Sequence, residues 1–163
     1  MKTSSASAPP LPFEPEFVEA LREIFERRIV FNQLLGLRID QVEPDGRARA
    51  RIAMRPDLVG HYAYNRLHGG VISAGLDAMA GLSSMAAIGG RFRDESIEQR
   101  LHRFARLGTI DLRIDYLRPA IGESFILESE VLRLGSRVAS TRMAFRGADG
   151  TLLSTGSGAY IVS

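Results

Sequence analysis

One stretch of the sequence combines residue types that could do chemistry: RLHGGVISAGLDAMAGLSSMAAIGG, from Arg66 to Gly90. From Gly69 onward nearly every side chain in it is small or apolar, and Asp77 is the one ionisable group. A carboxylate in apolar surroundings costs free energy unless it is hydrogen-bonded, and burial makes it a better proton acceptor. Asp77 is therefore a candidate general base. An aspartate at a loose helix turn, or one paired with an arginine from a strand, would give the same pattern.

The dipeptide Gly69-Gly70 after His68 marks the expected start of a helix. Two glycines let the backbone turn sharply and let a ligand approach closely. The first N–H groups of a helix have no internal partner and point outward at the positive end of the helix dipole. They could bind the oxyanion of an acyl-transfer intermediate. The structural alternative is a tight helix entry that His68 caps.

Other reactive residue types give weaker signals. Ser83 and Ser84 are expected to be small packing residues, and the sequence contains no G-x-S-x-G nucleophile motif. His61, His68 and His102 lack metal-ligand spacing such as H-E-x-x-H, and there is no cysteine to supply a thiolate. We therefore expect no metal site and no disulfide.

The stretch with Asp77 is predicted to form a long helix. Residues 69–88 exceed the length of most strands and are rich in Ala, Leu and Met. A second, amphipathic helix is predicted over residues 16–31, and a short one over residues 96–106. The apolar side chains at helical spacing in the second helix are Phe17, Leu21, Ile24, Phe25 and Val30.

Strands account for most of the remaining chain. A hairpin is predicted over residues 34–55, with its turn at Pro44-Asp45-Gly46. Its second strand alternates Ala48, Ala50, Ile52 and Met54 with arginines. Four more strands are predicted over residues 109–120, 123–135, 136–147 and 150–163. In the first of these, Ile110, Leu112, Ile114 and Tyr116 should share one face.

A run of antiparallel strands with a segregated helix is typical of an α+β domain. Because the helix over residues 69–88 is apolar nearly all round, it must be covered on most sides, and a curved antiparallel sheet wrapped around it would do this. A transmembrane helix is the alternative. However, a charge at the position of Asp77 would cost roughly 2.5–3.5 kcal/mol in a bilayer, so we expect no membrane association.

Composition is that of one soluble domain. The chain has 163 residues, 45% of them hydrophobic and 25% charged, with a net charge of +2. Lys2 is the only lysine, and no basic run argues for nucleic acid. We expect a disordered tail over residues 1–13 and a single domain over residues 14–163. The absence of cysteine and of a signal peptide favours the cytoplasm.

The segments LHGGVISAGLDAMAGL and GTIDLRIDYLRPA together resemble the PaaI-type hotdog-fold acyl-CoA thioesterases, most of all the YigI-like branch. That family is marked by H-G-G, an acidic residue nine positions after the histidine, and a later strand that ends in Y-L-R-P. The similarity runs from about Phe31 to Val162. It implies a hotdog fold, a homodimer with a joined sheet that often pairs into a tetramer, and hydrolysis of an acyl-CoA thioester. The YigI-like branch suggests medium or long acyl chains.

The resemblance also implies roles for particular residues. Asp77 becomes the general base or nucleophile, and the Gly69 N–H the main oxyanion donor. His68 becomes a positioning residue on the carbonyl side, and Thr109 supplies a hydroxyl that helps to hold the attacking water. The expected substrate contacts are His61, Asn65, Gly70, Arg118, Pro119, Ser136 and Arg137. Coenzyme A is part of the substrate, so no cofactor is expected.

The chain departs from the family pattern at one place. Many members have an asparagine six or seven residues before the histidine, where this chain has Tyr62 and His61, and its nearest asparagine is Asn65. Two alternatives keep the fold but change the function. An enoyl-CoA hydratase would need an aspartate and an Asn-Pro that YNRLH lacks. An acyl-CoA sensor usually carries a DNA-binding domain, which the segment before Phe31 is too short to hold.

Overall fold

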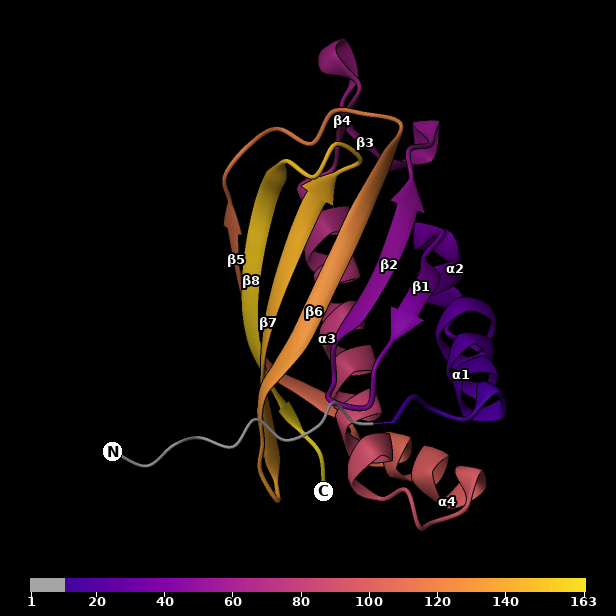
Figure 1. Ribbon diagram of the computed structural model, residues 1–163. Coiled ribbons are helices and arrows are strands. Elements are labelled where there is room, and N and C mark those ends of the chain that lie inside the picture. The colour runs from indigo at the N-terminus through magenta and orange to yellow at the C-terminus, as the bar shows by residue number, and fades with distance from the viewer. Residues whose placement is uncertain (1–10) are drawn as a thin grey trace.

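The computed structural model describes residues 11–163 (Figure 1). A six-stranded antiparallel sheet, in the order β1-β2-β6-β7-β8-β5, curves around one long helix, α3. The helices are α1 (Pro15–Arg22), α2 (Val30–Leu35), α3 (Gly69–Arg91) and α4 (Ile97–His102). The sheet strands are β1 (Arg38–Val42), β2 (Ala48–Ala53), β5 (Gly108–Tyr116), β6 (Ser124–Leu134), β7 (Val138–Gly147) and β8 (Leu152–Ile161). This confirms the predicted α+β architecture.

The core lies between α3 and the inner face of the sheet. Every residue of α3 from Met79 to Gly89 is buried. The hydroxyl of Ser83 hydrogen-bonds to that of Ser129 on β6, which in turn donates to the Met79 carbonyl at 2.9 Å. The free-energy cost of burying these serine hydroxyls is therefore offset by hydrogen bonds between the helix and the sheet. The helix is long and apolar enough to cross a membrane, but 78% of its apolar window is buried inside the fold, as expected for a core helix.

The alternation predicted for the first hairpin is confirmed. Ala48, Ala50 and Ile52 are buried on β2 while the arginines between them are exposed. Gly46 takes the left-handed conformation (φ 89°) that the turn requires. The short helix expected over residues 96–106 is also present as α4 and a 3-10 turn. A capping box between Ser96 and Gln99 begins it.

The helix predicted over residues 16–31 is interrupted. After α1, a π-helical turn (Glu23–Arg28) ends at Ile29, which is extended (ψ 100°), and α2 starts again at Val30. The break changes the helical phase, so Val30 is 75% exposed rather than part of the core. Of the tail expected over residues 1–13, the structure describes Leu11 to Phe13. Phe13 is buried against Phe17, with 4.7 Å between ring centroids, whereas residues 1–10 lie outside the described residues.

Two local features were not predicted. Between β2 and α3 the chain forms a small hairpin of β3 (Val59–His61) and β4 (Arg66–Leu67) that rises above one end of α3 (Figure 1). In β5, the register with β8 shifts between Thr109 and Asp111. This β-bulge places an extra residue at Ile110, which is 55% exposed instead of sharing the inner face with Leu112 and Ile114.

Candidate active site

The carboxylate of Asp77 is partly buried on α3 and is held by two hydroxyl groups. Its Oδ1 accepts hydrogen bonds from Thr109 Oγ1 at 2.9 Å and from Tyr160 Oη at 2.8 Å. No arginine within residues 11–163 forms an ion pair with it. The alternative of a structural Asp–Arg pair therefore does not hold. The structure brings together Asp77 and Thr109, two residues that the family resemblance assigns to one site.

Tyr160, on β8, is the site residue that sequence reasoning missed. It is 2% exposed, and burial together with its bond to Asp77 raises the pKa of its hydroxyl well above the usual range. The phenol is therefore a proton donor in this hydrogen bond at any working pH. A signal for it exists in the sequence. In TGSGAY, the period of two places Gly156, Gly158 and Tyr160 on the same face of the strand.

The start of α3 presents one free backbone donor. The Gly70 N–H is bonded to His68 Nδ1 at 2.8 Å, and the N–H groups of Val71 and Ile72 donate to the His68 carbonyl. Within residues 11–163 no acceptor is bonded to the Gly69 N–H. His68 thus caps the helix, as the structural alternative predicts, and it leaves Gly69 as the N–H that can bind an oxyanion. The predicted substrate contact by Gly70 would require that cap to open.

A second tyrosine holds the backbone at the helix start. Tyr116, at the end of β5, donates its hydroxyl to the Gly69 carbonyl at 3.0 Å. Thr109, at the beginning of β5, donates to Asp77. The edge strand β5 therefore supports Asp77 near one end and Gly69 near the other.

Asp77 and Gly69 are too far apart to act on one thioester within one chain. They are eight residues apart on a single helix, which corresponds to about 12 Å at 1.5 Å per residue. A reacting carbonyl carbon must lie roughly 3 Å from its nucleophile while its oxygen contacts the oxyanion donor. Either one of the two groups is not catalytic, or the site takes Gly69 from one subunit and Asp77 from another.

Two of the predicted substrate residues lie on the β3–β4 hairpin. Asn65 has a left-handed backbone (φ 46°), which asparagine tolerates better than most residues, so its place in the turn has a structural reason. The His61 ring lies against the rings of Tyr62 and Tyr64, and its Nδ1 is buried without a hydrogen-bond partner within the described residues. Since the hairpin adjoins His68, both residues are at the Gly69 end of α3.

The residues expected to contact coenzyme A fall into two groups. Arg118 and Pro119 follow β5 at the Gly69 end, and the Arg118 guanidinium donates to the Leu152 carbonyl at 2.9 Å. Ser136 and Arg137 form the turn between β6 and β7 at the opposite end of the sheet (Figure 1). One chain therefore does not bring the two groups together.

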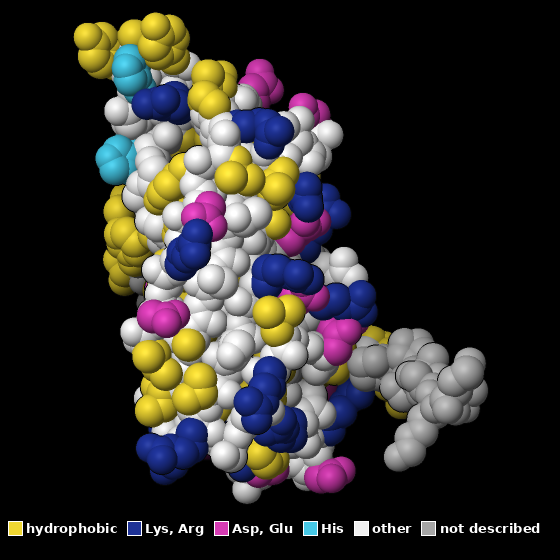
Figure 2. Space-filling view, turned by 90° about the vertical axis from the view of Figure 1, so that its left-hand side faces the viewer, with side chains coloured by type: hydrophobic (Ala, Val, Ile, Leu, Met, Phe, Trp, Pro, Cys, Tyr) yellow, Lys and Arg dark blue, Asp and Glu magenta, His cyan; other side chains and the backbone are white. Residues whose placement is uncertain are grey.

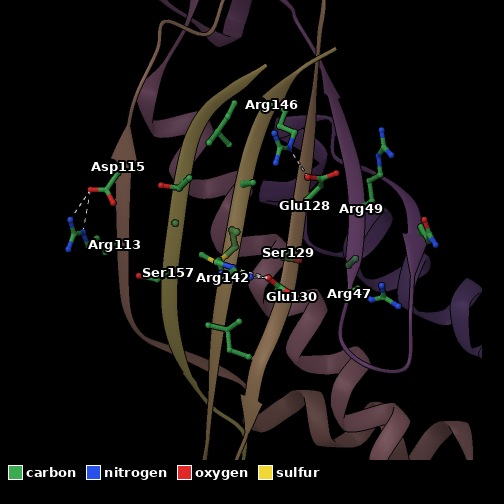
Figure 3. Close-up of a pocket in the computed structure, with 18 of the residues that line it drawn as sticks. Arg47, Arg49, Arg113, Asp115, Glu128, Ser129, Glu130, Arg142, Arg146 and Ser157 are labelled. Atoms are coloured by element: carbon green, nitrogen blue, oxygen red, sulfur yellow. Dashed lines mark hydrogen bonds and ion pairs between the residues drawn. The ribbon is translucent and has the colours of Figure 1, made fainter. Parts of the chain in front are cut away.

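A hollow of about 930 Å³ lies away from Asp77, on the outer face of the sheet (Figure 3). Six of its charged side chains form the ion pairs Arg146–Glu128, Arg142–Glu130 and Arg113–Asp115, and Glu43, Arg47 and Arg49 line it as well. It is lined by no nucleophile–base pair. Among residues 11–163 no group of three or more His, Asp or Glu side chains is placed to bind a metal ion.

Comparison with known proteins identifies the family of this chain. The family model of the thioesterase superfamily matches residues 64–154. The medium/long-chain acyl-CoA thioesterase YigI of Salmonella typhimurium is 37% identical over 86% of this chain and 90% of its own length. YigI of Escherichia coli K12 is 36% identical over the same shares.

Solved structures show the same fold. A thioesterase-superfamily protein from Shewanella oneidensis superposes with a TM-score of 0.83 at 36% identity, over 93% of this chain and all of that one. Mouse thioesterase superfamily member 2 has a TM-score of 0.70 at 18% identity, over 93% and 100% of the two chains. The sheet wrapped around α3 is a hotdog fold, and the chain belongs to the thioesterase superfamily.

Proposed function

We propose that this protein hydrolyses medium- or long-chain acyl-CoA thioesters, with Asp77 as the base or nucleophile and the Gly69 N–H as the oxyanion donor. The observation that carries the proposal is the Asp77 carboxylate, fixed by two hydroxyl donors in an otherwise apolar helix of this family. The relatives named as medium/long-chain acyl-CoA thioesterases support the substrate class. A cytoplasmic location follows from that substrate as part of the proposal.

The proposed site lies between two copies of the chain that join antiparallel along β5. As an edge strand, β5 has a free row of N–H and C=O groups. Exposed apolar side chains lie on it or follow it: Ile110, Tyr116, Leu117 and Ile121. Figure 2, which views this side of the molecule, shows hydrophobic side chains on it and at the end that carries β3 and β4.

Antiparallel pairing would bring Asp77 of one subunit near Gly69 of the other, although the two are far apart within one chain. The Thr109 end of one β5 would lie beside the Tyr116 end of the other, because the two strands run in opposite directions. Asp77 is bonded to the first end and Gly69 to the second. Each of two symmetric sites would then combine Asp77 of one subunit with the partner's Gly69. The further pairing of dimers into a tetramer stays a prediction.

Two routes of hydrolysis fit these groups. As a base, Asp77 takes a proton from water while the water oxygen bonds to the thioester carbon. The carbon–sulfur bond then breaks, and the sulfur leaves as coenzyme A with a proton. As a nucleophile, Asp77 bonds to the carbon and expels the sulfur, and water then cleaves the anhydride. In both routes the negative carbonyl oxygen of the intermediate is bound by the Gly69 N–H.

A thioester panel tests the proposal. We would measure thiol release from acyl-CoA of increasing chain length, the loss of enoyl absorbance with a trans-2-enoyl-CoA, and binding by calorimetry. We expect thiol release, fastest on medium or long chains. Loss of the enoyl signal without thiol would show hydration, and binding without either change would show a sensor. Both results would overturn hydrolysis.

The two routes are separable by isotope. A single turnover in ¹⁸O-labelled water places the label in the released acid when Asp77 acts as a base. The nucleophilic route places label in the Asp77 side chain after repeated turnover, because water attacks the anhydride at either carbonyl.

A further inference from the structure

The buried hydroxyl of Tyr160 points at the proposed catalytic carboxylate. The other three tyrosines, Tyr62, Tyr64 and Tyr116, are 93%, 66% and 54% exposed, whereas Tyr160 is 2% exposed. A buried tyrosine needs a hydrogen-bond partner for its hydroxyl. A backbone carbonyl would satisfy it, but here the partner is Asp77 Oδ1 at 2.8 Å.

The backbone of β5 is adjusted to bring a second hydroxyl to the same oxygen. Thr109 lies directly opposite Tyr160, and Leu112 lies opposite Gly158. Regular pairing would place Ile110 opposite Tyr160 and turn Thr109 toward the outer face. The bulge inserts Ile110 as the extra residue, so Thr109 faces α3 and reaches Oδ1 at 2.9 Å.

The strand also leaves room for the tyrosine ring. A Cβ atom at Gly158 would lie 3.0 Å from Tyr160 Cε2 and 3.3 Å from its hydroxyl oxygen. Glycine at this position therefore lets the ring take the orientation that carries its hydroxyl to Asp77. Three local features, the buried tyrosine, the bulge and the glycine, thus converge on one oxygen atom.

We propose that Tyr160 is a positioning residue for Asp77: together with Thr109 it holds Oδ1, so that Oδ2 is the oxygen that acts on water or on the thioester. Within residues 11–163 no donor is bonded to Oδ2. This inference rests on the proposed function, in which Asp77 is catalytic. Two hydroxyl donors on one oxygen fix the plane of the carboxylate.

Tyr160 does not transfer a proton in this account. Its pKa is raised by burial and by the charges of Asp77 and Asp111, so it remains a donor throughout the reaction. Asp111 is the other carboxylate near it, and it accepts the Ala159 N–H at 3.2 Å.

Tyr160→Phe tests the inference, since it removes one oxygen and keeps the buried ring. We expect kcat to fall about tenfold or more, the scale of one hydrogen bond to a charged group, with KM near that of the unchanged protein. A purely structural tyrosine would change the melting temperature without changing the kcat of the folded protein.

Three further variants sharpen the test. Thr109→Val removes the other donor from an edge strand without touching the core, and should lower kcat with little change in KM, as Tyr160→Phe does. Thr109→Ser keeps the hydroxyl and should stay within about twofold of the original kcat. Ser154→Ala is the matched control. Its buried Oγ on the same strand has no partner within the described residues, and its loss should leave kinetics unchanged.

The outcomes separate this inference from the proposed function. Tyr160→Phe and Thr109→Val with unchanged kcat, beside an inactive Asp77→Asn, would overturn the positioning role alone. An active Asp77→Asn would overturn the proposed function as well. Thermal melting of each variant checks the fold. If phenylalanine at position 160 lowers stability, Thr109→Val still decides whether donors to Oδ1 matter.

Discussion

The two halves of α3 differ in how far their residues are buried. From Met79 to Gly89 every residue is buried, and α1 packs so closely that a Cβ atom at Gly89 would lie 2.5 Å from Phe17 Cζ. From Gly69 to Ala78 only Ile72, Gly75 and Leu76 are buried, and this half carries the Gly69 N–H and the Asp77 carboxylate. Residues 79–89, which we call the closed half, thus form part of the core. Residues 69–78, which we call the open half, carry the candidate site.

The closed half is expected to control stability rather than chemistry. Phe17→Ala should lower the free energy of unfolding by about 3–5 kcal/mol, because it leaves a cavity against Gly89 and removes the ring under the Arg100 guanidinium. Denaturant titration measures this loss. Phe17→Leu is the control and should cost clearly less. The kcat per folded molecule should stay unchanged, and a proportionate fall in kcat would show that the two halves are coupled.

The open half is expected to control chemistry rather than stability. Asp77→Asn keeps the shape of the side chain but removes the proton acceptor. We predict a fall in kcat by a factor of at least roughly 10², with the melting temperature nearly unchanged. Steady-state kinetics with a long-chain acyl-CoA measures it. Activity within a few-fold of the original would remove Asp77 from the mechanism.

The smallest effects are expected at two arginines proposed to contact coenzyme A, Arg118 at the Gly69 end of α3 and Arg137 at the opposite end of the sheet. Arg118→Ala and Arg137→Ala should raise KM several-fold with little change in kcat, because contacts to coenzyme A phosphates are the same in the ground and transition states. The effect should shrink with a pantetheine thioester, which lacks the nucleotide. The bond from Arg118 to the Leu152 carbonyl gives the competing explanation. Equal losses on both substrates would indicate that the arginines are structural.

The closed half was the more predictable from sequence. The apolar run over residues 69–88 and the alternation on β2 predicted the long helix and the sheet around it, because burial imposes a period on the sequence. The break at Ile29 and the bulge at Ile110 were missed, since both change the phase of a pattern without leaving a glycine or proline as a marker.

The open half was predictable in part. Asp77 and Gly69 stand out by type and position, and the family resemblance added Thr109. Tyr160 was not found, because it lies 83 residues from Asp77 in sequence and only the register of β5 and β8 brings the two together. Tyr116 was predicted to share one face of its strand with Leu112 and Ile114, but its bond to the Gly69 carbonyl follows only from the structure.

The claim that each site takes Asp77 from one subunit and Gly69 from the other can be tested with paired variants. Gly69→Pro is suited to this test because proline is tolerated at the first position of a helix and removes the N–H. His68 already has the extended backbone (ψ 135°) that precedes proline. Gly69→Ala is the matched control. It meets the same Tyr116 ring at 3.3 Å but keeps the N–H, so it should stay far more active.

The most direct measurement is the activity of Asp77→Asn mixed with Gly69→Pro under conditions that exchange subunits. Each variant alone should be nearly inactive. After exchange, half of the dimers hold one site with both defects and one with neither, so activity should rise toward about a quarter of that of the unchanged protein. Native mass spectrometry confirms that mixed dimers have formed. If folded, exchanged subunits regain no activity, the shared site is wrong.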